Sequence, residues 1–129
     1  KKDFLPETGE NAVSQITSHV LDLSAGRPAS GIAISLVKLD EIHGSKVTET
    51  IGKVVTNKDG RANDLVETNT VLEKGSYQLH FDLAPYFHDL GIQVFFPSAD
   101  ITFVIEGNGE HYHIPLLLSP FGYSTYRGS

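Results

Sequence analysis

Short stretches in which apolar and polar residues alternate recur along the chain, and this pattern constrains the fold more than any other feature. Residues 76–83 are an example, because Tyr77, Leu79 and Phe81 occupy every second position. Alternation of this kind places successive side chains on opposite faces of a strand. Turn-forming residues separate the stretches. We predict strands at 16–23, 32–39, 47–56 (interrupted at Gly52), 76–83, 101–105, 111–118 and 123–127, with a weaker extended segment at 61–66.

Two other segments carry different signals. Residues 57–60 end in Asp-Gly, which predicts a tight turn because glycine supplies the positive φ that hairpins need. In residues 84–90, Tyr86, Phe87 and Leu90 fall at i, i+1 and i+4, and Gly91 follows in the C′ position. This spacing predicts a helix of about two turns. Many short strands with one brief helix indicate an all-β protein built as an antiparallel sandwich.

The chain length of 129 residues fits one domain that can bury a core without metals or disulfides. Residues 1–14 contain charges, Pro6 and Gly9 with little periodicity, so we expect a flexible lead-in or a linker there, followed by a domain over 15–129. Residues 5–9 spell LPETG, the pentapeptide of sortase substrates. That signal acts near a C-terminus, before an apolar segment, so we attribute this match to chance.

Charge and composition exclude several classes of function. The formal net charge of −6 argues against a nucleic-acid partner, since neutralising phosphates needs a basic surface. No apolar run approaches the roughly 20 residues that span a bilayer, and without cysteine there is no thiolate chemistry. A GxSxG nucleophile elbow, a phosphate loop and a dinucleotide-binding glycine pattern are all absent from the sequence, which argues against the corresponding enzymes.

Two of the six histidines lie on one face of a predicted strand. In residues 111–118 the two-residue period puts Tyr112, Ile114, Leu116 and Leu118 on one face, and His111, His113, Pro115 and Leu117 on the other. Paired imidazoles suit general acid–base catalysis or metal ligation, although a merely solvated strand face is the simpler alternative. Because proline cannot donate to the ladder, Pro115 predicts a bulge, a sheet edge or an interrupted ladder.

The remaining histidines carry weaker signals. His43 in a turn, His88 on the predicted helix and His80 opposite an apolar strand face are all expected at the surface. His19 lies mid-strand and reads by itself as a hydrogen-bonded structural histidine. If His19 converged with His111 and His113, the three could ligate zinc with water as the fourth ligand. No HExxH or other close ligand spacing supports that alternative.

Four sequence blocks together carry a family resemblance that runs from about residue 16 to residue 129. They are Ser-His-Val-Leu-Asp at 18–22, Asp-Gly-Arg at 59–61, the histidine-proline-leucine block at 111–120, and Tyr-Arg-Gly-Ser at 126–129. In this combination and order the chain resembles the transthyretin-related 5-hydroxyisourate hydrolases. The resemblance implies a sandwich of two four-stranded sheets with one short helix, and a homotetramer assembled as a dimer of dimers.

The resemblance also implies an activity. Family members hydrolyse 5-hydroxyisourate, the product of urate oxidation, to 2-oxo-4-hydroxy-4-carboxy-5-ureidoimidazoline, without a metal or other cofactor. Carried over to this chain, the expected catalytic residues are His19, Arg61, His113 and Ser129. Substrate contacts are expected from His19, Arg61, His111, Tyr126 and Arg127. We expect His113 to act as general base and Arg61 as the electrophilic clamp, but the residues alone do not decide which histidine takes the proton.

A binding protein is the competing interpretation. The resemblance places the hydrolase sites in a channel at the dimer–dimer interface. Transthyretin shares the fold and carries thyroid hormone in that channel, but it lacks the histidine set and the terminal tetrapeptide, so the residues here favour hydrolysis. The compartment stays open, with the cytoplasm expected first and the peroxisome or periplasm as alternatives. Some plant relatives are fused behind a second domain, and residues 1–14 would suit a linker from such a fusion.

Overall fold

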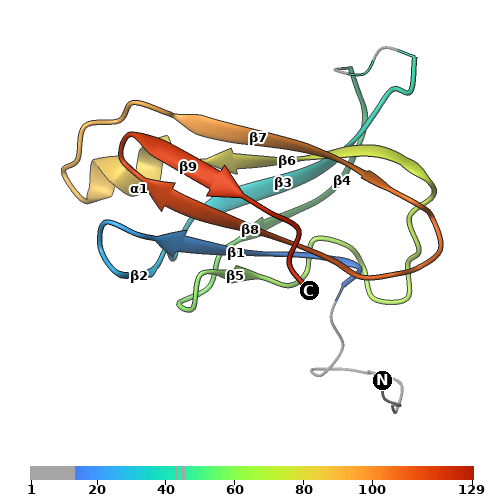
Figure 1. Cartoon of the computed structure of the whole chain (residues 1–129), viewed down its shortest axis with the longest axis horizontal. Coiled ribbons are helices and arrows are strands. Elements are labelled where there is room, and N and C mark those ends of the chain that lie inside the picture. Colours follow the sequence, from blue (N-terminus) through green and yellow to red (C-terminus); the bar gives the residue numbers. More distant parts are fainter. Residues whose placement is uncertain (1–13, 43, 45) are drawn as a thin grey trace.

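Two β-sheets pack face to face in the computed structural model, which describes residues 14–42, 44 and 46–129 (Figure 1). One sheet has the strand order β2-β1-β8-β9, with β5 also paired to β1, and the other has the order β4-β3-β6-β7. The elements are β1 (Ile16–Asp22), β2 (Arg27–Pro28), β3 (Ala33–Leu39), β4 (Val47–Val55), β5 (Arg61–Ala62), β6 (Gly75–Asp82), α1 (Ala84–Asp89), β7 (Ser98–Ile105), β8 (Tyr112–Ser119) and β9 (Gly122–Thr125).

The predicted all-β sandwich with one short helix is confirmed, with two differences in detail. The sheet that contains β1 has five strands instead of four, because the two-residue strand β5 pairs with β1 in addition to β2. In addition, β1 and β8 run parallel, whereas the alternation had been interpreted as a wholly antiparallel sandwich. The parallel pairing aligns the two strands residue by residue over their whole length, and this alignment matters for the site below.

The core lies between the two sheets and is built from every second residue of each central strand. On β8 the predicted inward face is confirmed, since Tyr112, Ile114, Leu116 and Leu118 are all buried. From the opposite sheet, β3 and β6 contribute inward side chains in the same alternation. Each fully buried aliphatic side chain of this kind contributes roughly 1.5–3 kcal/mol. The sheet that carries the histidines is therefore a rigid platform.

Helix α1 closes one end of the sandwich (Figure 1). Gly91, at φ +71°, follows the helix in the C′ position as predicted, and a proline lies in the first turn. Phe87 is buried in the core, and the Tyr86 hydroxyl donates a hydrogen bond of 2.6 Å to the Asp22 carboxylate at the end of β1. Burial and this carboxylate raise the pKa of Tyr86 to about 12, so the phenol keeps its proton and remains the donor.

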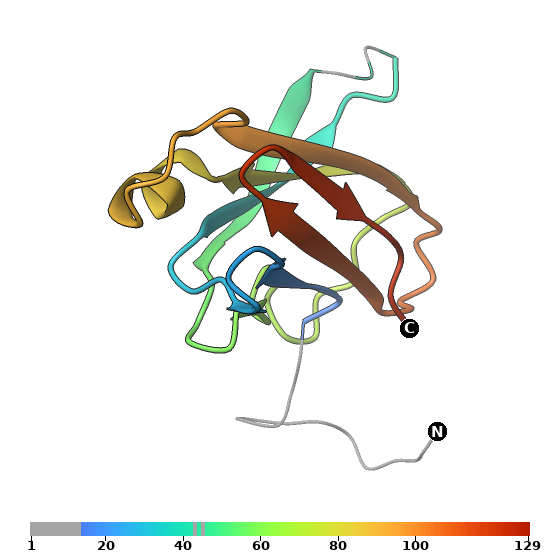
Figure 2. The same ribbon diagram turned by 60° about the vertical axis from the view of Figure 1, so that its left-hand side comes forward.

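The C-terminal strand ends earlier than the alternation suggested. We expected strand structure over residues 123–127, but β9 ends at Thr125, and Pro115 explains why. Proline has no N–H to donate to a ladder, and the Thr125 hydroxyl donates to the Pro115 carbonyl at 2.7 Å. The predicted interruption at Pro115 is confirmed for the ladder with β9, which stops at Leu116 opposite Thr125, whereas the ladder with β1 continues through Pro115. Beyond it the chain rejoins β8, where Gly128 N–H donates to the His113 carbonyl at 2.7 Å, so the C-terminus lies beside the start of β8 (Figure 2).

Two further predictions concern residues 1–14 and the turn that contains His43. Ser14, expected in the lead-in, is buried, and its N–H donates to the Asn63 carbonyl at 3.2 Å. The rest of that segment, including the LPETG pentapeptide, and His43 lie outside the described residues. Among the residues that are described, no helix has the length and apolar character needed to cross a membrane.

Candidate active site

Polar side chains gather on the outer face of the five-stranded sheet, where three strands lie side by side. The register pairs Thr17 of β1 with His113 of β8, and His19 of β1 with Arg61 of β5. The residues that alternate with them point into the core: Ser18 is fully buried, and so is Ala62. Since side chains alternate between the two faces of a sheet, all four partners of these pairs share the outer face.

The predicted tight turn at residues 57–60 places Arg61. The Asn57 side-chain oxygen accepts hydrogen bonds from the N–H groups of Asp59 and Arg61, at 2.9 and 3.0 Å. Gly60 has φ +75°, and a Cβ added there would come within 2.4 Å of the Val20 carbonyl oxygen. Only glycine meets both conditions. The turn therefore packs tightly on β1 and sets Arg61 opposite His19.

His19 has a defined proton arrangement. Its Nε2 lies 2.8 Å from the Asp59 carbonyl oxygen. A carbonyl can only accept, so Nε2 carries the hydrogen and neutral His19 keeps the lone pair on Nδ1. This histidine can therefore accept a hydrogen bond through Nδ1 while Nε2 is held by the turn.

The His113 imidazole is held on two sides. Its Nδ1 lies 2.8 Å from the Thr17 hydroxyl oxygen on β1. On the other side the chain end passes so close that a Cβ added to Gly128 would lie 2.8 Å from His113 Cδ2. Nε2, bonded to Cδ2 on the ring edge away from Nδ1, is the nitrogen that remains for a reacting molecule.

Burial and neighbouring charge keep this imidazole neutral. Burial, and then the positive charge of Arg61 and the nearby His111 and His19, lower the pKa of His113 below its ordinary value of 6.5. Burial likewise lowers the pKa of His111. At neutral pH His113 is therefore a free base, as a proton acceptor must be.

A polar pocket of about 470 Å³ brings these groups together, a volume within the usual range for small-molecule sites. Its lining residues are Thr17, Arg61, Asn63, His111, His113 and Ser129. Four of the predicted residues thus converge, and His19 is adjacent through its pairing with Arg61. Thr17 and Asn63 were not predicted. The two-residue period of a strand could have indicated both. Thr17 lies two residues before His19, and Asn63 lies two residues after Arg61, so each shares a face with a predicted site residue.

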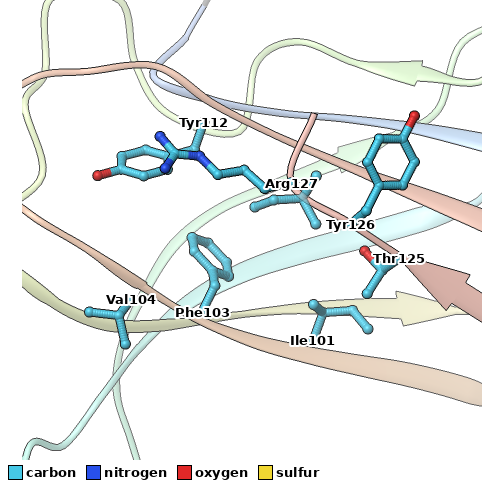
Figure 3. A pocket seen from close by; sticks show the side chains of 8 residues that line it. Ile101, Phe103, Val104, Tyr112, Thr125, Tyr126 and Arg127 are labelled. Atoms are coloured by element: carbon cyan, nitrogen blue, oxygen red, sulfur yellow. The ribbon is translucent and has the colours of Figure 1, made fainter. Parts of the chain in front are cut away.

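Two predicted substrate contacts lie elsewhere. Tyr126 and Arg127 line an apolar recess at the edges of β7 and β8, together with Ile101 and Phe103 (Figure 3). There the Arg127 guanidinium lies over the Tyr112 ring, 4.6 Å from its centroid, and donates to the Glu110 carboxylate at 2.6 Å. The lining of this recess includes no histidine and no carboxylate, so we place the chemistry in the polar pocket instead.

The histidines do not gather as a chelating set. The His111 and His113 rings lie 6.5 Å apart between centroids, nearly parallel at 17°, with the Thr17 hydroxyl bonded to both. His19 is engaged by the turn. Within the described part of the chain, no group of three histidine, aspartate or glutamate residues could hold a metal ion.

A model of the HIUase/Transthyretin family matches residues 16–128. The chain belongs to this family. A 5-hydroxyisourate hydrolase from Halalkalibacterium halodurans is 40% identical over 119 residues, which cover 89% of this chain and 98% of that protein.

Solved structures with a similar backbone include a 5-hydroxyisourate hydrolase and a transthyretin in complex with thyroxine. Klebsiella pneumoniae 5-hydroxyisourate hydrolase superposes with a TM-score of 0.75 at 36% identity, covering 90% of this chain and 99% of that one. Sea bream transthyretin in complex with thyroxine gives 0.79 at 29% identity, covering 89% and 95%. The backbone therefore does not separate the two activities, and the side chains of the site have to.

The backbone of residues 126–129, the tail of the chain, passes close to His113. A small substitution at Gly128 should therefore lower turnover. In Gly128→Ala the new Cβ would lie 2.8 Å from the imidazole and 3.3 Å from the His113 carbonyl oxygen, so ring or tail has to shift. We expect turnover to fall by about 100-fold, the order that a displacement of about 1 Å costs. The matched control is Gly122→Ala, whose Cβ would meet only the Ser119 hydroxyl at 3.9 Å. Equal turnover in Gly128→Ala and Gly122→Ala would contradict the close packing of Gly128 against the His113 ring.

Proposed function

We propose that this protein hydrolyses 5-hydroxyisourate to 2-oxo-4-hydroxy-4-carboxy-5-ureidoimidazoline, in the degradation of urate. One observation carries the proposal: Arg61, His113 and Ser129 line one pocket, and His19 lies beside it. The curated name of the 40%-identical bacterial relative supports the same activity. Loss of the absorbance of freshly prepared 5-hydroxyisourate, beyond the spontaneous rate, is the direct test.

The proposed reaction opens a cyclic amide with water. The Nε2 lone pair of His113 takes a proton from the water, and the resulting hydroxide adds to the ring carbonyl carbon. The C–N bond then breaks, and the proton passes from His113 to the departing nitrogen. A neutral imidazole is needed for the first step, and the lowered pKa of His113 provides it.

Arg61 and His19 are suited to binding and polarising the substrate. Arg61 offers planar N–H donors that match adjacent oxygen acceptors, and its fixed charge stabilises the oxyanion that develops on the attacked carbonyl. The Nδ1 of His19 can accept a hydrogen bond from a substrate N–H or from the water, because its Nε2 is bonded to Asp59. The same turn holds the His19 ring through the Asp59 carbonyl and the Arg61 backbone through the Asn57 side chain, so both residues start from a defined position beside the pocket.

Residues 126–129 contribute to the proposed site in two ways, by lining the pocket and by contacting the substrate. Ser129 lines the pocket and can place the water or His113 through its hydroxyl. Tyr126 and Arg127 remain predicted substrate contacts. In a single chain Arg127 is bonded to Glu110 and Tyr126 is 57% exposed, so any contact they make with the substrate would be to one bound by another copy or after a rearrangement of the tail.

We further propose that the active form is a homotetramer, assembled as a dimer of dimers. The pocket lies on an open sheet face, and excluding water from it requires a cover that residues 14–42, 44 and 46–129 of one chain do not supply. Phe95 and Phe121, 63% and 72% exposed, are additional apolar surface that assembly would bury. A mass in solution of four chains of 14.1 kDa each is expected from light scattering.

A hormone carrier is the alternative, because the thyroxine complex of sea bream transthyretin has an equally similar backbone. The charged and polar lining of this pocket argues against it, since a large aromatic ligand favours a wide apolar channel. Saturable thyroxine binding, with 5-hydroxyisourate decaying only at its spontaneous rate, would favour the carrier.

The lowered pKa of His113 predicts the pH dependence of the reaction. His113 must be unprotonated to act, so the acid limb of kcat/KM should lie below pH 6.5, the ordinary histidine value. Arg61 disfavours the protonated ring, so removing its charge in Arg61→Gln should raise the pKa of His113 and move the limb to higher pH. An NMR titration of His113 measures this shift even where turnover is low.

The charge control for this experiment is Lys53→Gln, on the exposed side of β4 in the other sheet. It removes the same charge from a residue that neither lines the pocket nor affects the pKa of His113, so the titration of His113 should stay unchanged. An unshifted His113 in Arg61→Gln, or a shift to lower pH, would contradict the proposed influence of Arg61.

A further inference from the structure

Thr17 connects two histidines through one hydroxyl. Its Oγ1 lies 2.8 Å from His113 Nδ1 and 3.0 Å from His111 Nε2, and the side chain is buried, with 4% exposure. A hydroxyl group has a single hydrogen to donate. It can therefore donate to only one of the two rings, and the other ring must donate to it or lose the bond. The proton positions on the two imidazoles are thus linked.

The direction of these bonds decides whether His113 can act as a base. If Thr17 donates to His113 Nδ1, the neutral ring carries its hydrogen on Nε2, and the nitrogen that faces the pocket has no lone pair. If Thr17 donates to His111 Nε2, it accepts from His113 Nδ1–H, and the Nε2 lone pair of His113 is free.

Two features favour the second direction. His111 is neutral at pH 7 because burial lowers its pKa, so its Nε2 can accept the Thr17 hydrogen. When His113 gains a proton on Nε2 during the reaction, its Nδ1 must donate. In the second direction Nδ1 already donates to Thr17, so no hydrogen bond has to reverse. In the first direction Nε2 already carries a hydrogen, so a proton gained by His113 would have to go to Nδ1, which accepts the Thr17 hydrogen. Two hydrogens would then lie between Thr17 Oγ1 and Nδ1, and this would oppose protonation of His113.

We infer that Thr17 is a positioning residue that donates to His111, accepts from His113 Nδ1–H, and so holds His113 in the tautomer whose Nε2 is the base. This inference rests on the proposed function of His113. It also gives His111 a role, as the acceptor that fixes the direction of the Thr17 hydroxyl. The parallel pairing of β1 with β8, which sets Thr17 opposite His113, is what makes the arrangement possible.

The test uses the full chain and reads the tautomer directly. Two-dimensional ¹⁵N–¹H NMR of imidazole nitrogens, at a pH where the histidines are neutral and without substrate, should show His113 protonated on Nδ1 in the wild type. Thr17→Val removes the hydroxyl and keeps the branched shape, and should shift His113 towards the Nε2–H form. Thr17→Ser keeps the hydroxyl and should retain the wild-type tautomer.

Kinetics provide the second readout. Thr17→Val should lower kcat by about 10- to 100-fold, as loss of a histidine's orienting partner does, with KM little changed, and Thr17→Ser should recover most of the rate. Ser18→Ala is the matched structural control. It removes the neighbouring buried hydroxyl, which bonds the Ile114 carbonyl at 2.7 Å on the inner face, so it should lower stability and leave the His113 tautomer intact.

The outcomes separate this inference from the proposed function. Wild-type His113 protonated on Nε2 overturns the role of Thr17, whatever the substrate is and whether or not Thr17→Val folds. A Thr17→Ser variant as slow as Thr17→Val, or an unchanged tautomer in Thr17→Val, overturns it as well. Absence of 5-hydroxyisourate hydrolysis by the wild type overturns the proposed function instead, and the NMR result on Thr17 still stands.

Discussion

Replacing His113 by asparagine is expected to lower kcat for 5-hydroxyisourate by about 100- to 10 000-fold, the range that general base catalysis supplies. The asparagine amide can still bond Thr17, which lies 2.8 Å from His113 Nδ1, but it offers no lone pair that accepts a proton near neutral pH. The ladder hydrogen bonds that join β8 to β1 and β9 are made by the backbone and persist. We therefore expect a folded protein whose melting temperature is near that of the wild type.

His80→Asn is the matched control for this variant. His80 is also a strand histidine bonded through Nδ1, at 2.5 Å to the Asp100 carboxylate, but it lies on the exposed face of the other sheet. Its replacement should leave turnover unchanged. If His113→Asn retains the turnover of His80→Asn, His113 is not the base, and His19 becomes the next residue to test.

Removing residues 126–129 is expected to abolish activity while the sandwich stays folded. The truncation deletes Ser129 from the pocket and the bond from Gly128 N–H to the His113 carbonyl, so one side of the imidazole loses its support. β9 ends at Thr125 and keeps its pairing with β8. The lost backbone hydrogen bond is worth about 1 kcal/mol, and the exposed ion pair of Arg127 contributes little.

Circular dichroism and a thermal melt establish that the truncated chain is folded, and the absorbance assay measures its turnover. Glu110→Gln is the control, because it breaks the ion pair with Arg127 and leaves the tail in place. It should keep most of the activity. Full activity in the truncated chain would show that the terminal residues are not part of the site.

Local sequence patterns predicted the elements of this fold because their causes are local. Alternation identified the inward face of β8, which the buried Tyr112 and Leu116 confirm, since a side-chain period of two follows from strand geometry alone. The Asp59-Gly60 turn was predictable for the same reason, because it depends on the φ of one residue. The end of β9 was missed, although Pro115 had already indicated that the ladder would be interrupted.

The assembly of the site was harder to predict because it depends on pairing between distant strands. Thr17 and His113 are far apart in the sequence and meet only through the parallel alignment of β1 with β8, which alternation does not specify. Family resemblance supplied His19, Arg61, His113 and Ser129, but it did not indicate Thr17. Nor did it indicate that Arg127 would bond Glu110 outside the pocket. These contacts required three-dimensional structure.

One measurement tests the central claim most directly. Freshly prepared 5-hydroxyisourate is mixed with the wild type, and with His113→Asn, and its absorbance is followed against the spontaneous decay. We predict that the wild type accelerates the decay strongly and that His113→Asn leaves it close to the spontaneous rate. A wild-type trace that follows the spontaneous decay, or equal acceleration by both proteins, would contradict histidine-assisted hydrolysis in this pocket.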